Sequence, residues 1–226
     1  MNSPNAQELE TIYARRFREN QAYRQRVWRV LVKQAFQPHV PETGAVLDLG
    51  CGYGEFINTV TAAVKYGMDL NPASAEHLAK GVTMLRQDCS ARWELPDESL
   101  DTVFTSNFFE HLPDKATLGK TLQQARRCLK PGGRLIAMGP NIKFLPGEYW
   151  DFWDHYLPLT ELSLSEGLET NGFRVEVCHA RFLPYTMVQT REYPGFVLAT
   201  YLKLPFVWRF FGKQFLVIAR KPEPTR

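Results

Sequence analysis

The chain has 226 residues, 44% of them hydrophobic, and its 27 Lys and Arg residues nearly balance 24 Asp and Glu residues at a net charge of +3. This length and apolar content suffice for one complete α/β core, and the small charge argues against a nucleic-acid partner, because such proteins usually carry a marked basic excess. No run of 18 apolar residues occurs, and the N-terminal MNSPNAQELE has no apolar signal-peptide segment, so we expect a cytoplasmic protein.

The cysteines show no pattern of a disulfide framework or a zinc finger. They lie far apart, with no C-x-x-C pair and no histidine at metal-finger spacing: Cys51, Cys89, Cys128 and Cys178. We therefore expect reduced thiols inside the core.

The first predicted elements are one or two helices within residues 7–37. This segment has no Gly or Pro, carries apolar residues such as Ile12, Val27 and Leu31 among many arginines, and is closed by Pro38.

A nucleotide site is predicted at VLDLGCGYGEF, residues 46–56. An apolar strand ends near the acid Asp48, and a glycine turn follows, in which a ligand can lie against bare peptide. The turn has glycine at alternate positions: Gly50, Gly52 and Gly54. A dinucleotide fingerprint would need glycine where this chain has Glu55, so the spacing favours a ligand without a pyrophosphate. We expect a helix to begin directly after the turn.

Further strands are predicted at regular intervals after the glycine turn. Asp69 ends the apolar run KYGMD, 15 residues after Gly54, and Asp88 follows the run VTMLRQ. A fourth strand is expected in DTVFTSNFFEHL (101–112), and the turn LKPGGRLI (129–136) leads into a fifth. Alternating strand-like and helical runs of this kind are typical of a parallel sheet with right-handed crossovers.

Two helices and two strands are predicted in the second half of the chain. Leu118, Leu122, Ala125 and Leu129 give residues 115–129 an apolar stripe at helical spacing. Residues 160–171 form a helix with Thr160 as its cap, FRVEVCHARF follows as an alternating strand, and QFLVIARK reads as the last strand. Between these strands, residues 185–213 interleave aromatic and basic side chains.

The glycine motif together with Asp69, Asp88 and the two later landmarks resembles the class I S-adenosylmethionine-dependent methyltransferases, over about residues 45–182. The resemblance implies a Rossmann-like three-layer α/β sandwich, in which a mostly parallel seven-stranded sheet has an antiparallel last strand and N-terminal helices are added. We expect a single domain, 1–226. Its parts are leading helices that act as a lid or pack on the sheet edge, a cofactor-binding core, an aromatic insert and the last strand: residues 1–41, 45–183, 184–213 and 214–221.

The resemblance also implies S-adenosylmethionine as cofactor and S-adenosylhomocysteine as product. The glycines would pass the methionine portion, Asp69 would accept hydrogen bonds from the ribose hydroxyls, and Asp88 would face the adenine amine beside the backbone amide of Cys89. The implied cofactor contacts are Asp48, Gly50, Cys51, Gly52, Gly54, Asp69, Leu70, Asp88, Cys89 and Asn107. The alternative for Asp69 is an acid that only shapes a turn.

Methyl transfer to a hydroxyl needs a positioned base as well as in-line placement. The stretch YWDFWDHYLPLT (149–160) provides His155, and a helix there would put Asp151 four residues away on the same face, where its carboxylate could fix the imidazole tautomer. The alternative is a packed aromatic lid in which His155 binds a backbone carbonyl. His111 is a second catalytic candidate, although we expect it mainly to cap or brace the helix that follows.

Asn107 is expected to orient a substrate or to satisfy carbonyls at the end of its own strand. We expect no metal, because Ser106 and Asn107 stand where metal-dependent members of the family carry an acid, and Asp151 and Asp154 alone do not make a site.

The expected acceptor is a hydroxyl of a small molecule, a sugar or a lipid-linked molecule, since the segments at residues 13–31, 145–168 and 204–221 resemble bacterial methyltransferases of small-molecule, glycan and lipid pathways. The aromatic and basic segment suits either peripheral membrane contact or closure over a soluble pocket. The alternative function is that of a partner or regulatory protein that binds the methyl donor but catalyses no reaction. The oligomeric state stays open.

Overall fold

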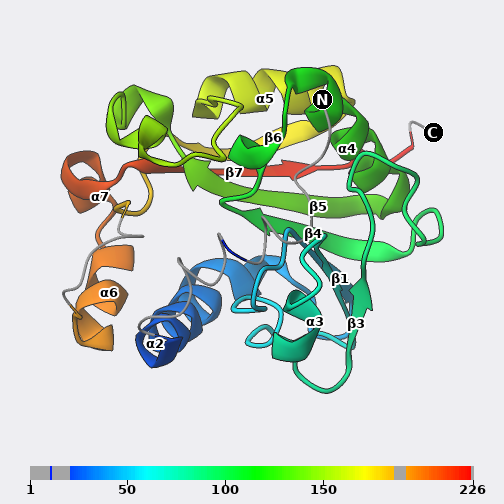
Figure 1. The fold of residues 1–226 in the computed structure, drawn as a ribbon, viewed down its shortest axis with the longest axis horizontal. Helices are drawn as coiled ribbons and strands as arrows, with labels where there is room; N and C mark the ends of the chain where they lie inside the picture. Colours follow the sequence, from blue (N-terminus) through cyan, green and yellow to red (C-terminus); the bar gives the residue numbers. More distant parts are fainter. Residues whose placement is uncertain (1–10, 12–20, 186–191, 225–226) are drawn as a thin grey trace.

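The computed structural model describes residues 11, 21–185 and 192–224, and its centre is a seven-stranded sheet in the order β3-β2-β1-β4-β5-β7-β6 (Figure 1). The strands are β1 (Ala45–Leu49), β2 (Val64–Met68), β3 (Val82–Leu85), β4 (Leu100–Ser106), β5 (Leu129–Pro140), β6 (Arg174–His179) and β7 (Gln214–Arg220). The predicted Rossmann-like three-layer sandwich is confirmed.

All neighbouring strands are parallel except those that pair with β7. β7 runs antiparallel to both β5 and β6, with Ile136 of β5 opposite Ile218. The strand order reverses between β1 and β4. From β1 the chain adds β2 and β3 on one side of the sheet, and from β4 it adds the remaining strands on the other side. In open α/β sheets, ligands bind outside the carboxyl ends of the strands at this reversal.

The two predicted helices of the second half form where they were expected. α4 (Lys115–Cys128) begins at Asp114, whose carboxylate accepts the amide hydrogen of Thr117 at 2.7 Å. α5 (Glu161–Thr170) begins at Thr160, where Thr160 and Ser163 form a reciprocal capping box. Each cap satisfies amides that the first helical turn leaves without an intrahelical acceptor.

The core lies on both faces of the sheet, because successive strand residues point to opposite sides. α4 and α5 cover one face and α2 (Gln21–Leu31) lies on the other (Figure 1). Toward α4 and α5 the strands direct Leu47, Val103, Leu135 and Val217. Toward α2 they direct Val46, Phe104, Ile136 and Ile218.

The prediction of a helix directly after the glycine turn is wrong. Residues 55–59 form turns that include helical hydrogen bonds from the amide of Asn58 to the carbonyl of Gly54 and from Val60 to Phe56, both 2.9 Å. The connection to β2 is short, and Lys65 Nζ donates to the carbonyls of Ile57 and Val60, each at 3.1 Å. The Lys65 ammonium therefore donates to carbonyls that would accept backbone amides in a longer helix. The next crossover is also brief, with only α3 (Ser74–His77).

The N-terminal helices and the aromatic segment lie side by side. α2 continues into η1 (Val32–Phe36) and η2 (Gln37–His39), and α6 (Gly195–Leu202) packs beside α2 (Figure 1). Arg26 of α2 pairs with Glu192 at 2.5 Å. α7 (Pro205–Phe211) follows α6. The parts of these predictions at residues 7–10, 12–20 and 186–191 lie outside the described residues.

The cysteine expectation holds in the core but not at the sheet edge. Cys51, Cys89 and Cys128 are buried free thiols, whereas Cys178 is exposed, because it belongs to the edge strand β6. No helix within residues 21–185 or 192–224 combines the length and apolar character needed to cross a bilayer.

Candidate active site

The glycine turn after β1 needs glycine at its first position. Gly50, Gly52 and Gly54 have φ angles of +71°, +52° and +78°, a region that residues with a Cβ rarely adopt. A Cβ at Gly50 would also collide with the ring of Phe108, which follows β4. The amides of Gly50 and Cys51 both donate to the carbonyl of Met68 at the end of β2, at 2.9 and 3.0 Å. The turn is therefore held between the ends of β2 and β4.

Asp69 ties this turn to the end of β2. Its Oδ2 accepts the amide hydrogen of Gly52 at 2.9 Å, and its Oδ1 accepts that of Asn71 at 2.8 Å. The side chain is buried. A carboxylate offers about four lone-pair sites, and these two bonds use one on each oxygen.

Asp48 is the least hydrated acid of the turn. It is buried inside β1, and burial raises its pKa well above the ordinary range, with further raising by Glu55 and Asp69 and an opposing hydrogen bond from the backbone of Ile57. Burial likewise raises the pKa of the Cys51 thiol. Both side chains are therefore buried next to the turn.

The residues expected near the adenine lie at the end of β3. Asp88 is exposed, and its Oδ1 accepts from the amide and hydroxyl of Ser90 at 2.7 and 2.8 Å. Cys89 is buried beneath it: its carbonyl accepts from the indole of Trp93 at 2.8 Å, and burial raises the pKa of its thiol to about 11. Leu70 is 38% exposed, so its side chain offers an apolar surface beside Asp69.

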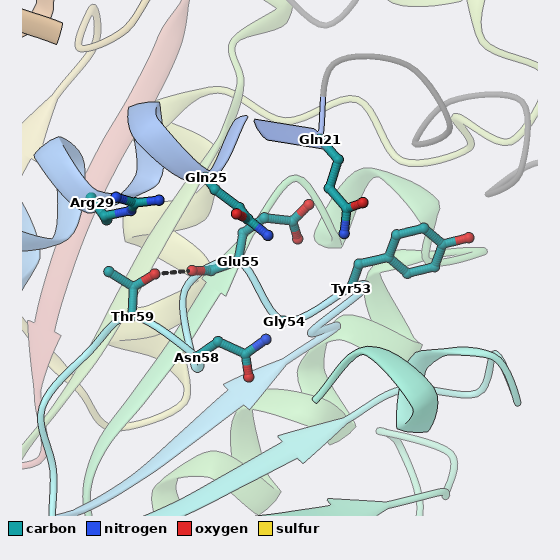
Figure 2. A pocket seen from close by; sticks show the side chains of 8 residues that line it. All are labelled: Gln21, Gln25, Arg29, Tyr53, Gly54, Glu55, Asn58 and Thr59. Atoms are coloured by element: carbon teal, nitrogen blue, oxygen red, sulfur yellow. Dashed lines mark hydrogen bonds between the residues drawn. The ribbon is translucent and has the colours of Figure 1, made fainter. Parts of the chain in front are cut away.

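α2 lies over the glycine turn. Arg24 donates to Glu55 at 2.6 Å. A polar hollow of about 210 Å³ separates the two segments, and Figure 2 shows the side chains of α2 directed toward those of the turn. Its lining is Gln21, Gln25, Arg29, Tyr53, Gly54, Glu55, Asn58 and Thr59. Pockets for small-molecule ligands are usually larger, about 300 Å³ or more.

Asn107 forms the sharp backbone turn that follows β4. Its φ angle is +50°, its amide donates to the carbonyl of Met138 at 2.9 Å, and its Nδ2 donates to the hydroxyl of Ser106 at 3.1 Å. Its buried Oδ1 accepts no hydrogen bond from the described part of the chain. The side-chain amide therefore presents an acceptor at the end of β4.

His111 lies against the segment before α5. It ends η3 (Phe109–His111), and its Nδ1 lies 2.8 Å from the carbonyl oxygen of Asp154 and 3.2 Å from Oδ2 of the same residue. The cap of α4 is Asp114, so the expected capping role of His111 is wrong. No local sequence pattern indicates the contact of His111 with Asp154.

His155 is buried in an aromatic frame. Its Nδ1 lies 2.8 Å from the carbonyl oxygen of Tyr149, and the ring of Phe152 stacks on it at 4.8 Å between centroids. The short helix η5 (Glu148–Asp151) ends at Asp151, so the helix on which the expected pairing of Asp151 with His155 depended does not form. Asp151 is exposed. A backbone carbonyl orients the imidazole, as the alternative expectation had it.

Glu110 completes a compact group with the two histidines. Its side chain is buried, and its backbone carbonyl accepts the amides of Tyr156 and Leu157 at 2.8 and 3.0 Å, which binds the end of β4 to the segment that carries His155. One ligand atom from each of Glu110, His111 and His155 lies within 4.8 Å of the others. We call these three residues the Glu–His–His cluster. The local sequence pattern around Glu110 assigns it no role.

The whole arrangement combines a glycine turn at the reversal of strand order, an acid at the end of β2 and a buried Glu–His–His cluster after β4. A family model described as "Methyltransferase domain" matches residues 20–177, which is more than half of the chain. The chain belongs to the class I S-adenosylmethionine-dependent methyltransferase family. S-adenosylmethionine is thus its cofactor.

Related sequences support the same family. A protein of Mycolicibacterium smegmatis named "Probable S-adenosylmethionine-dependent methyltransferase" is 34% identical over 137 residues, covering 58% of this chain and 52% of the relative. The 2-methyl-6-phytyl-1,4-hydroquinone methyltransferase of Synechocystis is 27% identical over 155 residues, covering 59% of this chain and 47% of the relative. The chain therefore spans about half the length of these curated relatives.

Solved structures share the methyltransferase fold over nearly the whole chain. A chain solved in complex with the Haloferax volcanii Trm112 methyltransferase activator has a TM-score of 0.70 at 19% identity, covering 98% of this chain and 99% of that one. A SAM-dependent methyltransferase from Archaeoglobus fulgidus has a TM-score of 0.67 at 23% identity, with 94% and 99% covered. At these identities the likeness concerns the fold.

Proposed function

We propose that this methyltransferase transfers the methyl group of S-adenosylmethionine to a hydroxyl oxygen of a small molecule, a sugar or a lipid-linked acceptor in the cytoplasm. The observation that carries the proposal is the Glu–His–His cluster beside the glycine turn. A hydroxyl must lose its proton as the new bond to carbon forms, and a group placed at the acceptor is needed for this at neutral pH.

The cluster lies close to where the methyl donor is expected. Phe108, two residues before Glu110, packs against Gly50 of the cofactor turn. On the other side, a Cβ placed on Gly139 of β5 would lie 3.6 Å from Oε2 of Glu110. The cluster thus sits at the carboxyl ends of β4 and β5, on the cofactor side of the sheet.

His155 is our candidate for the group that acts on the acceptor hydroxyl. Its Nδ1 faces the carbonyl of Tyr149, and a carbonyl can only accept, so Nδ1 carries the hydrogen and Nε2 has the lone pair. His111 is the second candidate. Asp154 lies against the Nδ1 of His111, whereas Asp151 is exposed, so Asp154 supports the site better than Asp151 does.

The exposed aromatic residues of α6 and α7 favour a lipid-linked acceptor among these. Phe196, Phe206, Phe210 and Phe211 are each more than 60% exposed. Lys203 and Arg209 lie in the same segment. Aromatic side chains with neighbouring cations suit the interface of an anionic membrane, where peripheral contact would bring the site to its substrate.

Donor binding and methyl transfer are tested separately. Calorimetry with S-adenosylmethionine and S-adenosylhomocysteine measures the first. Incubation with methyl-labelled donor and a fractionated bacterial extract, with lipid and aqueous fractions kept apart, measures the second. Label in a small-molecule, sugar or lipid fraction supports the enzyme. Tight donor binding with no labelled fraction supports instead the rival reading, a non-catalytic partner protein.

A further inference from the structure

We propose that Glu110, His111 and His155 bind one divalent transition-metal ion, with Mn²⁺ or Zn²⁺ as the ion, at the acceptor end of the site. This inference rests on the proposed hydroxyl transfer for its purpose, but the binding of the ion can be measured without it. The site corrects the expectation of no metal, which rested on Ser106, Asn107, Asp151 and Asp154 and did not include these three residues.

The spacing of the three side chains fits a single ion after a small adjustment. One ligand atom from each residue lies within 4.8 Å of the others, and the rings of His111 and His155 are 5.0 Å apart between centroids. Bonds of about 2.1 Å to one ion place tetrahedral ligand atoms about 3.4 Å apart. Side-chain movements of about 1 Å therefore close the site.

Both imidazoles are oriented as metal ligands usually are. A ligating histidine generally donates its other ring hydrogen to a carbonyl or carboxylate oxygen, which fixes the tautomer and raises the basicity of the ligating nitrogen. Nδ1 of His155 faces the carbonyl of Tyr149 at 2.8 Å. Nδ1 of His111 faces Asp154, with its carbonyl at 2.8 Å and its carboxylate at 3.2 Å. Nε2 is thus the ligating nitrogen of each ring.

The donor set selects the class of ion. Two imidazoles and one carboxylate suit zinc, manganese and iron, whereas magnesium and calcium prefer oxygen ligands only. Three protein ligands also leave a coordination position open, as in catalytic zinc sites. Glu110 and His155 are buried, and the His111 side chain is 25% exposed, so the cluster is reached from the side of His111.

An ion held here gives the site a way to deprotonate a weakly acidic hydroxyl. A divalent cation lowers the pKa of an oxygen that it touches, by several units for water on zinc. The hydroxyl proton leaves to solvent, and the oxygen electron pair forms the bond to the methyl carbon. The electrons of the broken C–S bond stay on sulfur, which gives S-adenosylhomocysteine. With the ion bound, the Nε2 lone pair of His155 goes to the ion, so His155 acts on the hydroxyl through the ion and solvent takes the proton.

Metal binding is tested on untagged protein that has been stripped with EDTA and dialysed. Calorimetry with Mn²⁺ and with Zn²⁺, and the Mn²⁺ electron paramagnetic resonance signal, should give one site per chain. Glu110→Gln, His111→Gln and His155→Gln should each weaken binding at least tenfold. Glu148→Gln changes an exposed carboxylate of η5, and His39→Gln changes a histidine of η2, so both controls should bind as the wild type does.

A variant that leaves the three ligands in place sharpens the test. Asp154→Asn removes the carboxylate beside His111 and should weaken binding about 10- to 100-fold, as loss of such a supporting partner generally does. Circular dichroism and thermal melting in EDTA identify any variant that has failed to fold. Equal ion affinities in the wild type and in folded His155→Gln and Glu110→Gln proteins would overturn the proposal.

The outcomes for the ion and for the reaction are distinguishable. One equivalent of ion held through these residues supports the site even if no extract fraction gains a methyl group, in which case the proposed function fails alone. Methyl transfer that continues at full rate in stripped protein with EDTA present overturns the site and leaves the proposed function standing.

Discussion

Two buried carboxylates at the same edge of the sheet are held in different ways. Asp69, at the end of β2, uses its two oxygens for the amides of Gly52 and Asn71. Glu110, after β4, lies with the imidazoles of His111 and His155, and its segment is joined to that of His155 by backbone hydrogen bonds.

This difference shows that the two halves of the site depend on different parts of the fold. The cofactor half is fixed mainly by backbone geometry, because the glycine turn bonds to the end of β2 and packs against Phe108 after β4. The acceptor half needs residues 149–157 to dock on the end of β4. Substitutions should therefore separate donor binding from methyl transfer.

The largest expected effect comes from His155. His155→Ala should lower turnover about 100-fold or more, the usual scale for a group that acts on a transferred proton or holds a catalytic ion, while donor affinity stays within about twofold. Steady-state rates with the labelled acceptor and calorimetry with the donor check both. His39→Ala is the control, and turnover near that of the wild type in His155→Ala would contradict the role.

Asp69→Ala should have the next largest effect, on donor affinity. Loss of a charged acceptor costs about 1.5–3 kcal/mol, or roughly 10- to 150-fold in the dissociation constant, and it also frees the amide of Gly52. Asp88→Ala should cost only a few-fold, because Asp88 is exposed. Calorimetry with S-adenosylhomocysteine ranks the two, and the reverse order would contradict the placement of the ribose at Asp69.

Gly50→Ala tests the turn through stability. A side chain there meets a φ of +71° and the ring of Phe108, so we expect a loss of about 2 kcal/mol and a melting temperature lower by about 4–8 °C. Gly119→Ala is the control, because a Cβ at Gly119 in α4 meets open space and alanine favours a helix. Equal melting temperatures for both variants would argue against the turn geometry.

Asp48 should make stability depend on pH. Burial raises its pKa in the folded protein above the unfolded value of about 3.9, so the folded state binds more protons and the free energy of unfolding falls as pH rises from about 4 through the folded pKa. Asp48→Asn should flatten this slope in urea titrations between pH 5 and pH 8. Parallel slopes for variant and wild type would show that the carboxyl does not titrate in this window.

The smallest expected effect concerns the aromatic surface. Phe206→Ser with Phe210→Ser should reduce flotation with anionic liposomes while leaving the melting temperature unchanged, because both rings are more than 60% exposed. Glu94→Gln is a surface control. If the wild type itself does not float with the liposomes, membrane contact is excluded and a soluble acceptor remains.

The sequence predicts the glycine turn and the acid after β2 well, and the arrangement around His155 poorly, for a physical reason. The glycine turn and Asp69 depend on strand ends that a local pattern reveals, and α4 and α5 are marked by spacing and caps. The pairing of Asp151 with His155 assumed a helix, but η5 ends at Asp151. The contacts of His111 with Asp154, and of both histidines with Glu110, depend on loop docking that no local pattern encodes.

β7 has a consequence for how the protein matures during synthesis. It follows β6 in the chain, yet it lies between β5 and β6, and it supplies every backbone partner that joins β6 to the rest of the sheet. Until residues 214–220 leave the ribosome, β5 and β6 each present an unpaired edge, and such edges invite aggregation. A stalled nascent chain that lacks β7 should therefore engage chaperones and resist release as a folded domain.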